Sequence, residues 1–369
     1  MTSSRFRRYL LPGIVFQSAV IAGGYGTGRE IVEFFLSLGP VPGLAAMAVA
    51  AAIWSAVAAA TFEFARRFRT YEYRGFFRRL LGPGWILFEL CYIGMLLLVL
   101  AVVGAAAGAI GAETFGVPYA LGVLVTLGTV AVLLFLGSSA IERALAAWSF
   151  VLYAVYAALL VWSFARFGPE ISDAFSGSRL EGPWLGSGVQ YAGYNLVAGA
   201  VALFTVRHIE RRREAVAAGL LTGLIGMLPA LFFYVAMAGQ YPEIVAREVP
   251  ANALLEALGS RPFQVLFQIV LFGTLIETGT GMIHAVNERL AAARLEHGVA
   301  LPVWARPAVA AAFLLTALAL TPLGLRGLIE RGYGTITWGF IATYAVPVLT
   351  LGVWKALRGE KAGEDREEA

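Results

Sequence analysis

The residues that could do chemistry in this chain begin with a glycine-rich group inside an apolar segment. The run Gly23-Gly24-Tyr25-Gly26-Thr27-Gly28-Arg29-Glu30 lies within a hydrophobic stretch that extends from Leu10 to Leu38. Glycine weakens a helix by about 1 kcal/mol relative to alanine, and in a membrane each freed backbone group needs a new partner. A helix broken in this way is typical of the binding sites of secondary transporters, where the break lines a cavity. We therefore predict substrate binding at Gly23, Gly24, Tyr25, Gly26, Thr27, Gly28 and Arg29.

The composition places these residues in a membrane protein. The 369 residues are 59% hydrophobic and 14% charged, with a mean hydropathy of +0.74, which excludes a soluble globular domain. The single cysteine, Cys91, lies in an apolar run and supports neither a disulfide framework nor a thiolate metal site. We expect a protein embedded in a lipid bilayer that binds no nucleic acid, and the oligomeric state stays open.

Hydrophobic runs of about 20 residues predict ten membrane spans. They lie near 10–38, 41–65, 85–110, 118–136, 144–165, 187–206, 215–239, 263–290, 307–320 and 335–354. Most Lys and Arg residues fall in alternate loops, which favours a multi-pass protein of the bacterial inner membrane with both termini in the cytoplasm. The fold class expected is an all-α polytopic membrane protein.

The predicted sixth span contains a second glycine- and amide-rich group. Gln190-Tyr191-Ala192-Gly193-Tyr194-Asn195 is followed by Gly199, and Gly193-Tyr194-Asn195 echoes the order Gly24-Tyr25-Gly26. Corresponding breaks in the first span of each half are expected of an inverted repeat with discontinuous helices. Close helix packing is the alternative explanation of such glycines, and we accept it for Gly104. Tyr191, Tyr194 and Asn195 join the predicted substrate-binding residues.

The motif from Gly23 to Glu30 resembles that of the YkvI-like bacterial membrane proteins. These proteins in turn resemble distant members of the amino acid-polyamine-organocation superfamily, which has the LeuT-type fold. The resemblance implies a five-plus-five inverted repeat in which helices 1 and 6 are discontinuous and hold the substrate between them. It divides the chain into a first repeat (1–165), an extracytoplasmic connector (166–186), a second repeat (187–354) and a charged cytoplasmic tail (355–369).

The predicted eighth span carries polar residues on one helical face. Thr274, Glu277, Thr278, Gly281 and His284 recur at three- and four-residue spacing. A carboxylate at mid-membrane costs roughly 2.5–3.5 kcal/mol, so Glu277 should face the interior, be protonated or have a partner. In LeuT-type transporters a cation site lies between the first break and hydroxyls of span eight. By this resemblance we expect coupling to Na⁺ or H⁺ at Ala22, Tyr25, Glu30, Glu277, Thr278 and Thr280, with Na⁺ at Ala22, Tyr25, Thr278 and Thr280.

Two further polar residues need an explanation at membrane depth. The planar guanidinium of Arg29 suits either a carboxylate substrate or an internal pair with Glu30, Glu33 or Glu277. Tyr92, one turn from Glu89, is expected to reach the central cavity and bind substrate.

Enzymatic and ATP-driven functions find no support in the sequence. His208, His284 and His297 form no His-Glu-x-x-His motif, and no Walker motif is present. We expect no enzyme and no cofactor beyond Na⁺ or H⁺ as coupling ion. The predicted function is secondary active transport, by alternating access, of a small organic solute such as an amino acid or related zwitterion. The alternative is a ligand-sensing membrane receptor subunit on a transporter scaffold.

Overall fold

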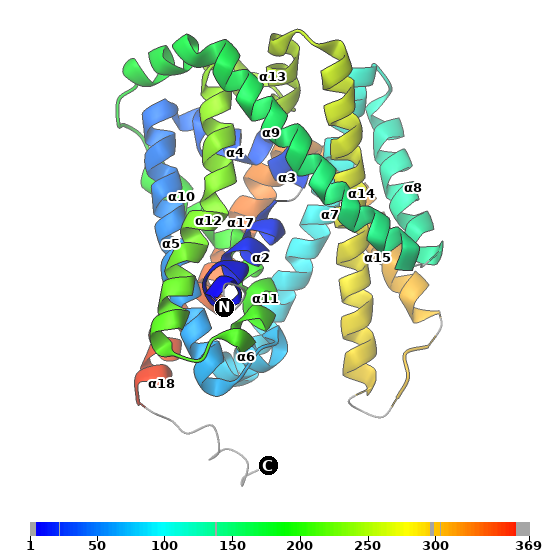
Figure 1. The fold of residues 1–369 in the computed structure, drawn as a ribbon. Coiled ribbons are helices and arrows are strands. Elements are labelled where there is room, and N and C mark those ends of the chain that lie inside the picture. Colours follow the sequence, from blue (N-terminus) through cyan, green and yellow to red (C-terminus); the bar gives the residue numbers. More distant parts are fainter. Residues whose placement is uncertain (1–4, 22, 137–138, 296–298, 303, 359–369) are drawn as a thin grey trace.

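The computed structural model describes residues 5–21, 23–136, 139–295, 299–302 and 304–358, and no strand occurs among them. Figure 1 shows long helices packed side by side in one bundle. The short helices α6 and α18 lie at the lower end of the bundle, and α13 lies at the upper end. These two ends are called the α6 end and the α13 end below. The expectation of an all-helical protein is confirmed for the described residues.

The first half of the chain forms a broken first helix followed by four long helices. Their bounds are η1 (Phe6–Leu10), α2 (Leu11–Val20), α3 (Gly23–Gly26), α4 (Arg29–Phe34), η2 (Leu36–Leu38), α5 (Pro40–Phe68), α6 (Tyr73–Leu81), η3 (Gly82–Gly84), α7 (Trp85–Phe115), α8 (Tyr119–Leu136) and α9 (Ser139–Ser176). The fifth predicted span is longer than expected, because α9 continues to Ser176 through a kink at Phe167, two residues before Pro169.

The second half repeats the alternation of short and long helices. The bounds are α10 (Trp184–Asn195), α11 (Val197–Ala202), η4 (Leu203–His208), α12 (Arg212–Ala238), η5 (Glu243–Ala246), α13 (Pro250–Leu258), α14 (Arg261–Leu295), α15 (Ala305–Leu320), η6 (Thr321–Leu323), α16 (Gly324–Gly327), η7 (Leu328–Tyr333), α17 (Gly334–Phe340), η8 (Ile341–Ala345), η9 (Val348–Gly352) and α18 (Val353–Arg358).

Seven helical stretches in the described part of the chain are long and apolar enough to cross a membrane, and Tyr119–Leu134 is a shorter apolar helix. The predicted count of ten is therefore not confirmed. The first predicted span divides into four short helical segments, α2, α3, α4 and η2, none of which is long enough to cross a membrane alone. The ninth and tenth predicted spans form one helical stretch, Ala305–Arg358. The seven long apolar stretches still identify a multi-pass membrane protein.

Helices of the two halves pack in corresponding pairs. α5 packs along α12, α7 against α14 and α2 against α11. At the α5–α12 contact, a Cβ on Gly219 would lie 2.3 Å from backbone atoms of Ala59, so the two backbones approach as closely as small-residue packing allows. Contacts of α5 with α10 and of α2 with α12 also join the two halves, and the inverted repeat stays a prediction. Gly104 faces Leu127 of α8 and Thr321, so it lies at a helix contact, as the packing explanation expects.

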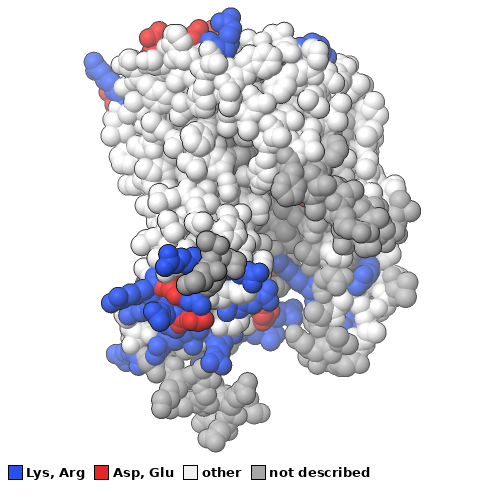
Figure 2. All heavy atoms as spheres, in the orientation of Figure 1, with Lys and Arg blue, Asp and Glu red and all other residues white. Residues whose placement is uncertain are grey.

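Charged side chains are distributed unevenly over the surface. Figure 2 shows a dense belt of Lys and Arg at the α6 end, few charges at the α13 end and a broad uncharged zone between them. Such a zone matches the hydrocarbon region of a bilayer. The broken first helix runs through the middle of this zone.

Candidate functional site

The first span is discontinuous, as the glycine run predicts. α2 ends at Ile21, which has an extended backbone (φ −76°, ψ 92°), and α3 is a single turn. Gly28 then adopts a left-handed conformation (φ 79°) at the start of α4, a conformation that side chains disfavour. Ala22, one of the predicted ion ligands, lies outside the described residues.

The sixth span is interrupted more narrowly than the sequence predicts. Only Leu196 separates α10 from α11, and its dihedral angles remain helical (φ −57°, ψ −25°). The hydrogen bonds at the interruption reach three residues, from the N–H of Leu196 to Gly193 and from the N–H of Gly199 to Leu196. The sixth span is therefore discontinuous, as the sequence predicts, but its backbone is not unwound, because the three-residue hydrogen bonds satisfy it in a tighter turn.

A cavity of about 480 Å³ lies where the two interruptions meet α14. This volume falls within the range of about 300–1,000 Å³ that is usual for small-molecule sites. The walls come from the end of α2, the starts of α4 and α11, and the middles of α7, α9 and α14. Its lining includes these predicted site residues: Glu30, Tyr92, Tyr194, Asn195, Glu277 and Thr278.

Glu30 is the more deeply buried of the two carboxylates that line the cavity. Its side chain is 2% exposed, and its carboxylate accepts a 2.7 Å hydrogen bond from the hydroxyl of Tyr194. Tyr194 in turn stacks on Tyr333, with 4.6 Å between ring centroids. A Cβ on Gly24 would lie 2.1 Å from a Glu30 oxygen, so the absence of a side chain there makes room for the carboxylate. The glycine run thus serves the site indirectly, through Glu30.

The cavity has an acidic and aromatic lining. Glu30 and Glu277 face it, together with four tyrosines, and no Lys, Arg or His is among the described residues that line it. Such a lining attracts a cation, through the carboxylates and through the negative faces of the rings.

The cavity lies on the α6 side of the breaks. Ser18 and Val201, on the segments that lead from the breaks toward the α6 end, are exposed. Beyond Glu30, toward the α13 end, Ile31 and Val32 are fully buried. The cavity lining is therefore more exposed toward the α6 end than the segment that follows Glu30.

A cation–π cluster borders the cavity beside Tyr92. Arg289 of α14 donates a 2.5 Å hydrogen bond to the hydroxyl of Tyr92, and its guanidinium lies 4.0 Å from the centroid of that ring. The same guanidinium lies 4.4 Å from the ring centroid of Tyr73, whose hydroxyl donates to Glu89. This cluster joins α6, α7 and α14.

Arg29 does not line the cavity. Its guanidinium, 1% exposed, donates to the carbonyls of Val245 (3.0 Å) and Arg247 (2.7 Å) and pairs with Glu33 at 2.8 Å. Arg326 lies 3.5 Å from the same Glu33 carboxylate. Of the two roles open for Arg29 in the sequence, the structure shows the internal pair.

Thr27 also serves the scaffold on the α13 side of the break. Its hydroxyl donates to the carbonyl of Gly24 at 2.8 Å, and its own carbonyl accepts from the N–H of Ala251 in α13 at 2.9 Å. Through these two hydrogen bonds, Thr27 connects the break in the first span to α13.

The other predicted residues lie beside the cavity. Tyr25 and Gly26 line a smaller adjoining pocket, and Gly28 faces Phe233 and Met237. Tyr191 is fully buried against Phe35 and Trp54.

Of the three predicted Na⁺ ligands that the structure describes, only Thr278 is among the lining residues of this cavity, and the Na⁺ site stays a prediction. The carbonyl of Tyr25 accepts from the N–H of Gly28 at 2.9 Å, and Thr280 is absent from the described cavity lining, whereas Thr278 is part of it. Within the described residues, no group of three or more His, Cys, Asp or Glu is arranged to hold a metal ion.

Sequence reasoning missed several lining residues. Tyr153 of α9 and Tyr333 of η7 line the cavity, as do Met95 and Met282. A tyrosine inside an apolar span is a signal for the first two, because its hydroxyl needs a partner. The methionines carry no such signal.

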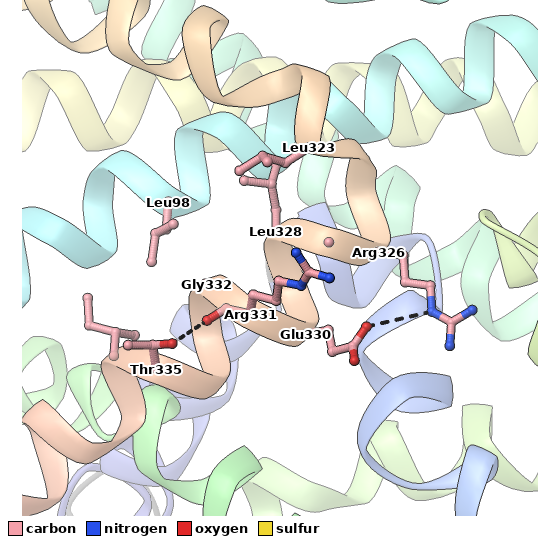
Figure 3. A pocket seen from close by; sticks show the side chains of 10 residues that line it. Leu98, Leu323, Arg326, Leu328, Glu330, Arg331, Gly332 and Thr335 are labelled. Carbon is pink, nitrogen blue, oxygen red and sulfur yellow. Dashed lines mark hydrogen bonds and ion pairs between the residues drawn. The ribbon is translucent and has the colours of Figure 1, made fainter.

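Another pocket, of about 760 Å³, is a surface groove away from this cavity. Figure 3 shows it between Leu98 of α7 and the segment from Leu323 to Thr335, with Glu330 pointing toward Arg326. Its charged residues are exposed, and Arg326 and Glu330 lie 3.9 Å apart. Exposed ion pairs of this kind contribute little stability, whereas the cavity contains a buried carboxylate, Glu30, so the cavity is the stronger candidate site.

Comparisons with known proteins agree with this architecture. No family model matches the chain. It is 24% identical over 340 residues to the uncharacterized membrane protein YkvI of Bacillus subtilis strain 168, with 89% of this chain and 92% of that protein covered. The resemblance to the YkvI-like proteins is thereby confirmed.

A solved structure shows a similar fold. The manganese transporter of Eremococcus coleocola, in complex with an aromatic bis-isothiourea substituted compound, has a TM-score of 0.53 and 15% sequence identity. The match covers 94% of this chain and 79% of that chain. At this identity the similarity concerns the fold.

Proposed function

We propose that this protein is a secondary active transporter of a small organic solute, an amino acid or related zwitterion. The observation that carries the proposal is the cavity at the interrupted helices, which contains the buried carboxylate of Glu30. Broken helices around a mid-membrane site are the arrangement that alternating access uses. The two similar proteins are described as a membrane protein and a transporter, which agrees with the expectation of a non-enzyme.

The cavity lining favours an organic solute over a divalent metal ion. Its described polar groups are two carboxylates, tyrosine hydroxyls, one amide and a few Ser and Thr hydroxyls. A manganese site needs several ligands that converge on one point, and the described residues contain no group of three or more His, Cys, Asp or Glu arranged in this way. An ammonium group needs only one or two carboxylates and an aromatic wall.

The distribution of charge favours a cytoplasmic α6 end. The basic belt of Figure 2 lies at that end, and basic loops remain on the cytoplasmic side of bacterial membranes. On this orientation both termini are cytoplasmic and the structure faces inward. A reporter fused after Arg358 that is active only in the periplasm should stay inactive.

Coupling to Na⁺ or H⁺ is proposed to involve the two cavity carboxylates, Glu30 and Glu277. If H⁺ couples, Glu277→Gln should flatten the pH dependence of uptake. If Na⁺ couples, Thr278→Ala should weaken the stabilisation of the protein by Na⁺. Wild-type dependence on both ions in these variants would contradict a coupling role for this face of α14.

Uptake into liposomes tests the proposed function directly. The full-length protein is reconstituted, and uptake of labelled amino acids is measured under a Na⁺ gradient or a pH gradient, with protein-free liposomes as control. We expect uptake of at least one amino acid under one gradient. Ligand-induced thermal stabilisation without uptake under either gradient would instead support the sensing receptor.

A further inference from the structure

The surface groove of Figure 3, with a volume of about 760 Å³, takes no part in the proposed solute site. It is here named the lateral groove. Apolar and charged side chains line it together, among them Leu98, Leu323, Arg326, Glu330, Arg331 and Ile336. Such a lining offers contacts both to hydrocarbon and to a charged group.

Contacts of α7 with η7 and α17 fix the depth of the groove along the bundle. A Cβ on Gly332 would lie 2.9 Å from Leu98, and a Cβ on Gly94 would lie 3.2 Å from Ile336. Leu98 lies about 20 Å along α7 from Trp85, at 1.5 Å per residue. Trp85 begins α7 at the α6 end, and tryptophan is typical of a membrane interface. Because the hydrocarbon layer is about 30 Å thick, the lateral groove lies within it.

The helical stretch beside the groove turns one face toward the lipid. Exposed residues recur along this stretch at three- and four-residue spacing, namely Arg331, Thr335, Trp338, Ala342, Val346 and Leu349. Trp338 is 56% exposed and Val346 is 52% exposed. Exposed apolar side chains in a row on a membrane helix face acyl chains, so Arg331 and Thr335 at the start of this row belong to the lipid-facing surface.

Arg331 brings an uncompensated positive charge to this surface. Its guanidinium is exposed and forms no ion pair within the described part of the chain. In Figure 3, dashed lines join Glu330 to Arg326 and Thr335 to the backbone of Arg331, but none reaches this guanidinium. A charge at membrane depth is costly unless it meets an opposite charge. The anionic group that a bilayer itself supplies is the phosphate of a phospholipid.

We propose that the lateral groove binds a phospholipid, whose phosphate pairs with Arg331 and one of whose acyl chains lies along Leu98, Leu323 and Ile336. A guanidinium can donate two parallel hydrogen bonds to a phosphate, and the apolar wall buries hydrocarbon. The lipid is a ligand of the outer surface and not the transported solute. This inference therefore stands independently of the proposed function.

Native mass spectrometry of the delipidated full-length protein tests this site with three probes. They are phosphatidylglycerol, diacylglycerol with the same acyl chains, and glycerol 3-phosphate. One phosphatidylglycerol per chain is expected to stay bound. Diacylglycerol lacks the phosphate and glycerol 3-phosphate lacks the chains, so each should bind at least about tenfold more weakly.

A charge substitution tests the place of the phosphate. Arg331→Gln should weaken the binding of phosphatidylglycerol at least about tenfold, because the glutamine carries no charge to pair with the phosphate. The matched control is Arg179→Gln, which removes another exposed arginine that lies outside the groove. This control should bind phosphatidylglycerol as the wild type does.

Filling the groove tests the place of the acyl chain. Thr335→Phe puts a ring into the groove and should also weaken the binding of phosphatidylglycerol at least about tenfold. Thr350→Phe is the matched control, because both threonines are exposed and each hydroxyl donates to the carbonyl four residues earlier, at 2.6 Å for Thr335 and 2.7 Å for Thr350. Thr350 lies outside the groove, so its substitution should leave lipid binding unchanged.

Several outcomes would overturn the lipid site. Wild-type binding of phosphatidylglycerol in Arg331→Gln would overturn the phosphate contact, and wild-type binding in Thr335→Phe would overturn the acyl-chain contact. Diacylglycerol that binds as tightly as phosphatidylglycerol would overturn phosphate recognition. Equally tight binding of glycerol 3-phosphate would make a soluble phosphate the ligand. A dimer that both variants dissociate, with lipid binding unchanged, would make a second copy of the chain the occupant of the groove.

Discussion

Glu30 and Glu33 lie one turn apart on α4, yet they belong to regions of opposite character. Glu33 meets two guanidinium groups, those of Arg29 and Arg326, on the α13 side of the break. Glu30 accepts a hydrogen bond from the neutral hydroxyl of Tyr194. It faces a cavity whose described lining has no basic residue. A carboxylate surrounded by cations serves the scaffold, whereas one left short of positive charge can attract a cationic ligand. The first-span motif therefore contains a structural half and a binding half.

The largest effect is expected when the structural half loses its cation. Arg29→Ala removes one partner of a buried ion pair and leaves the carbonyls of Val245 and Arg247 without their donor. Breaking such a pair costs about 3–5 kcal/mol of folding stability. The thermal midpoint, followed by fluorescence-detected size-exclusion chromatography, should fall strongly. Arg29→Lys keeps the charge but loses the planar guanidinium, so its thermal midpoint should lie between those of the wild type and Arg29→Ala. A wild-type midpoint in Arg29→Ala would remove the distinction between the two halves.

Neutralising the two glutamates in turn should give opposite results. Glu30→Gln keeps an oxygen that accepts from Tyr194, so the fold should persist, while solute binding should weaken by about 2 kcal/mol or more because the charge is lost. Glu33→Gln should lower the thermal midpoint and leave binding near the wild-type value. Isothermal titration and thermal unfolding measure the two properties separately. Loss of binding in Glu33→Gln at an unchanged midpoint would reverse the assignment.

Removing the hydroxyl that holds Glu30 should have a smaller effect. Tyr194→Phe keeps the ring on Tyr333 but loses a hydrogen bond to a charged acceptor, which contributes about 1.5 kcal/mol. We expect roughly tenfold weaker solute binding and a shifted pH profile of uptake, since Tyr194 positions the carboxylate. The matched control is Tyr191→Phe, because the buried hydroxyl of Tyr191 has no hydrogen-bond partner among the described residues. Equal effects of the two substitutions would make the Tyr194 hydroxyl a packing element only.

Much of this architecture follows from the sequence. Four glycines within six residues break the first span, and hydropathy identifies the long helices. The sequence does not separate residues that line the cavity from residues that support it. Arg29 and Glu30 are adjacent, and only the positions of Val245, Arg247 and Tyr194, about 165 to 220 residues away in the chain, decide which one faces the cavity.

The second interruption was harder to predict. Glycines and amides mark the sixth span, but the dihedral angles of Leu196 are helical, and α10 packs against α5 and α17. Propensity alone does not include such contacts. Similarly, Tyr333 and Tyr153 reach the cavity from η7 and α9, which no local pattern relates to the glycine motif.

The smallest effect is expected at Gly28, which begins the helix that carries both glutamates. Its φ of 79° costs a residue with a side chain about 1–2 kcal/mol, and a Cβ there would also meet Met237 at 3.0 Å and Phe233 at 3.2 Å. Because Gly28 lies outside the described cavity lining, Gly28→Ala should lower the thermal midpoint modestly and leave solute binding within about threefold of wild type. Gly116→Ala is the matched control, because Gly116 has a φ of 66° but an added Cβ would meet no atom within 4 Å. The thermal midpoint of Gly116→Ala should therefore fall less than that of Gly28→Ala. Lost binding in Gly28→Ala at an unchanged midpoint would return Gly28 to the substrate site that the sequence predicts, and the boundary between the two halves of the motif would then lie on the α13 side of Gly28.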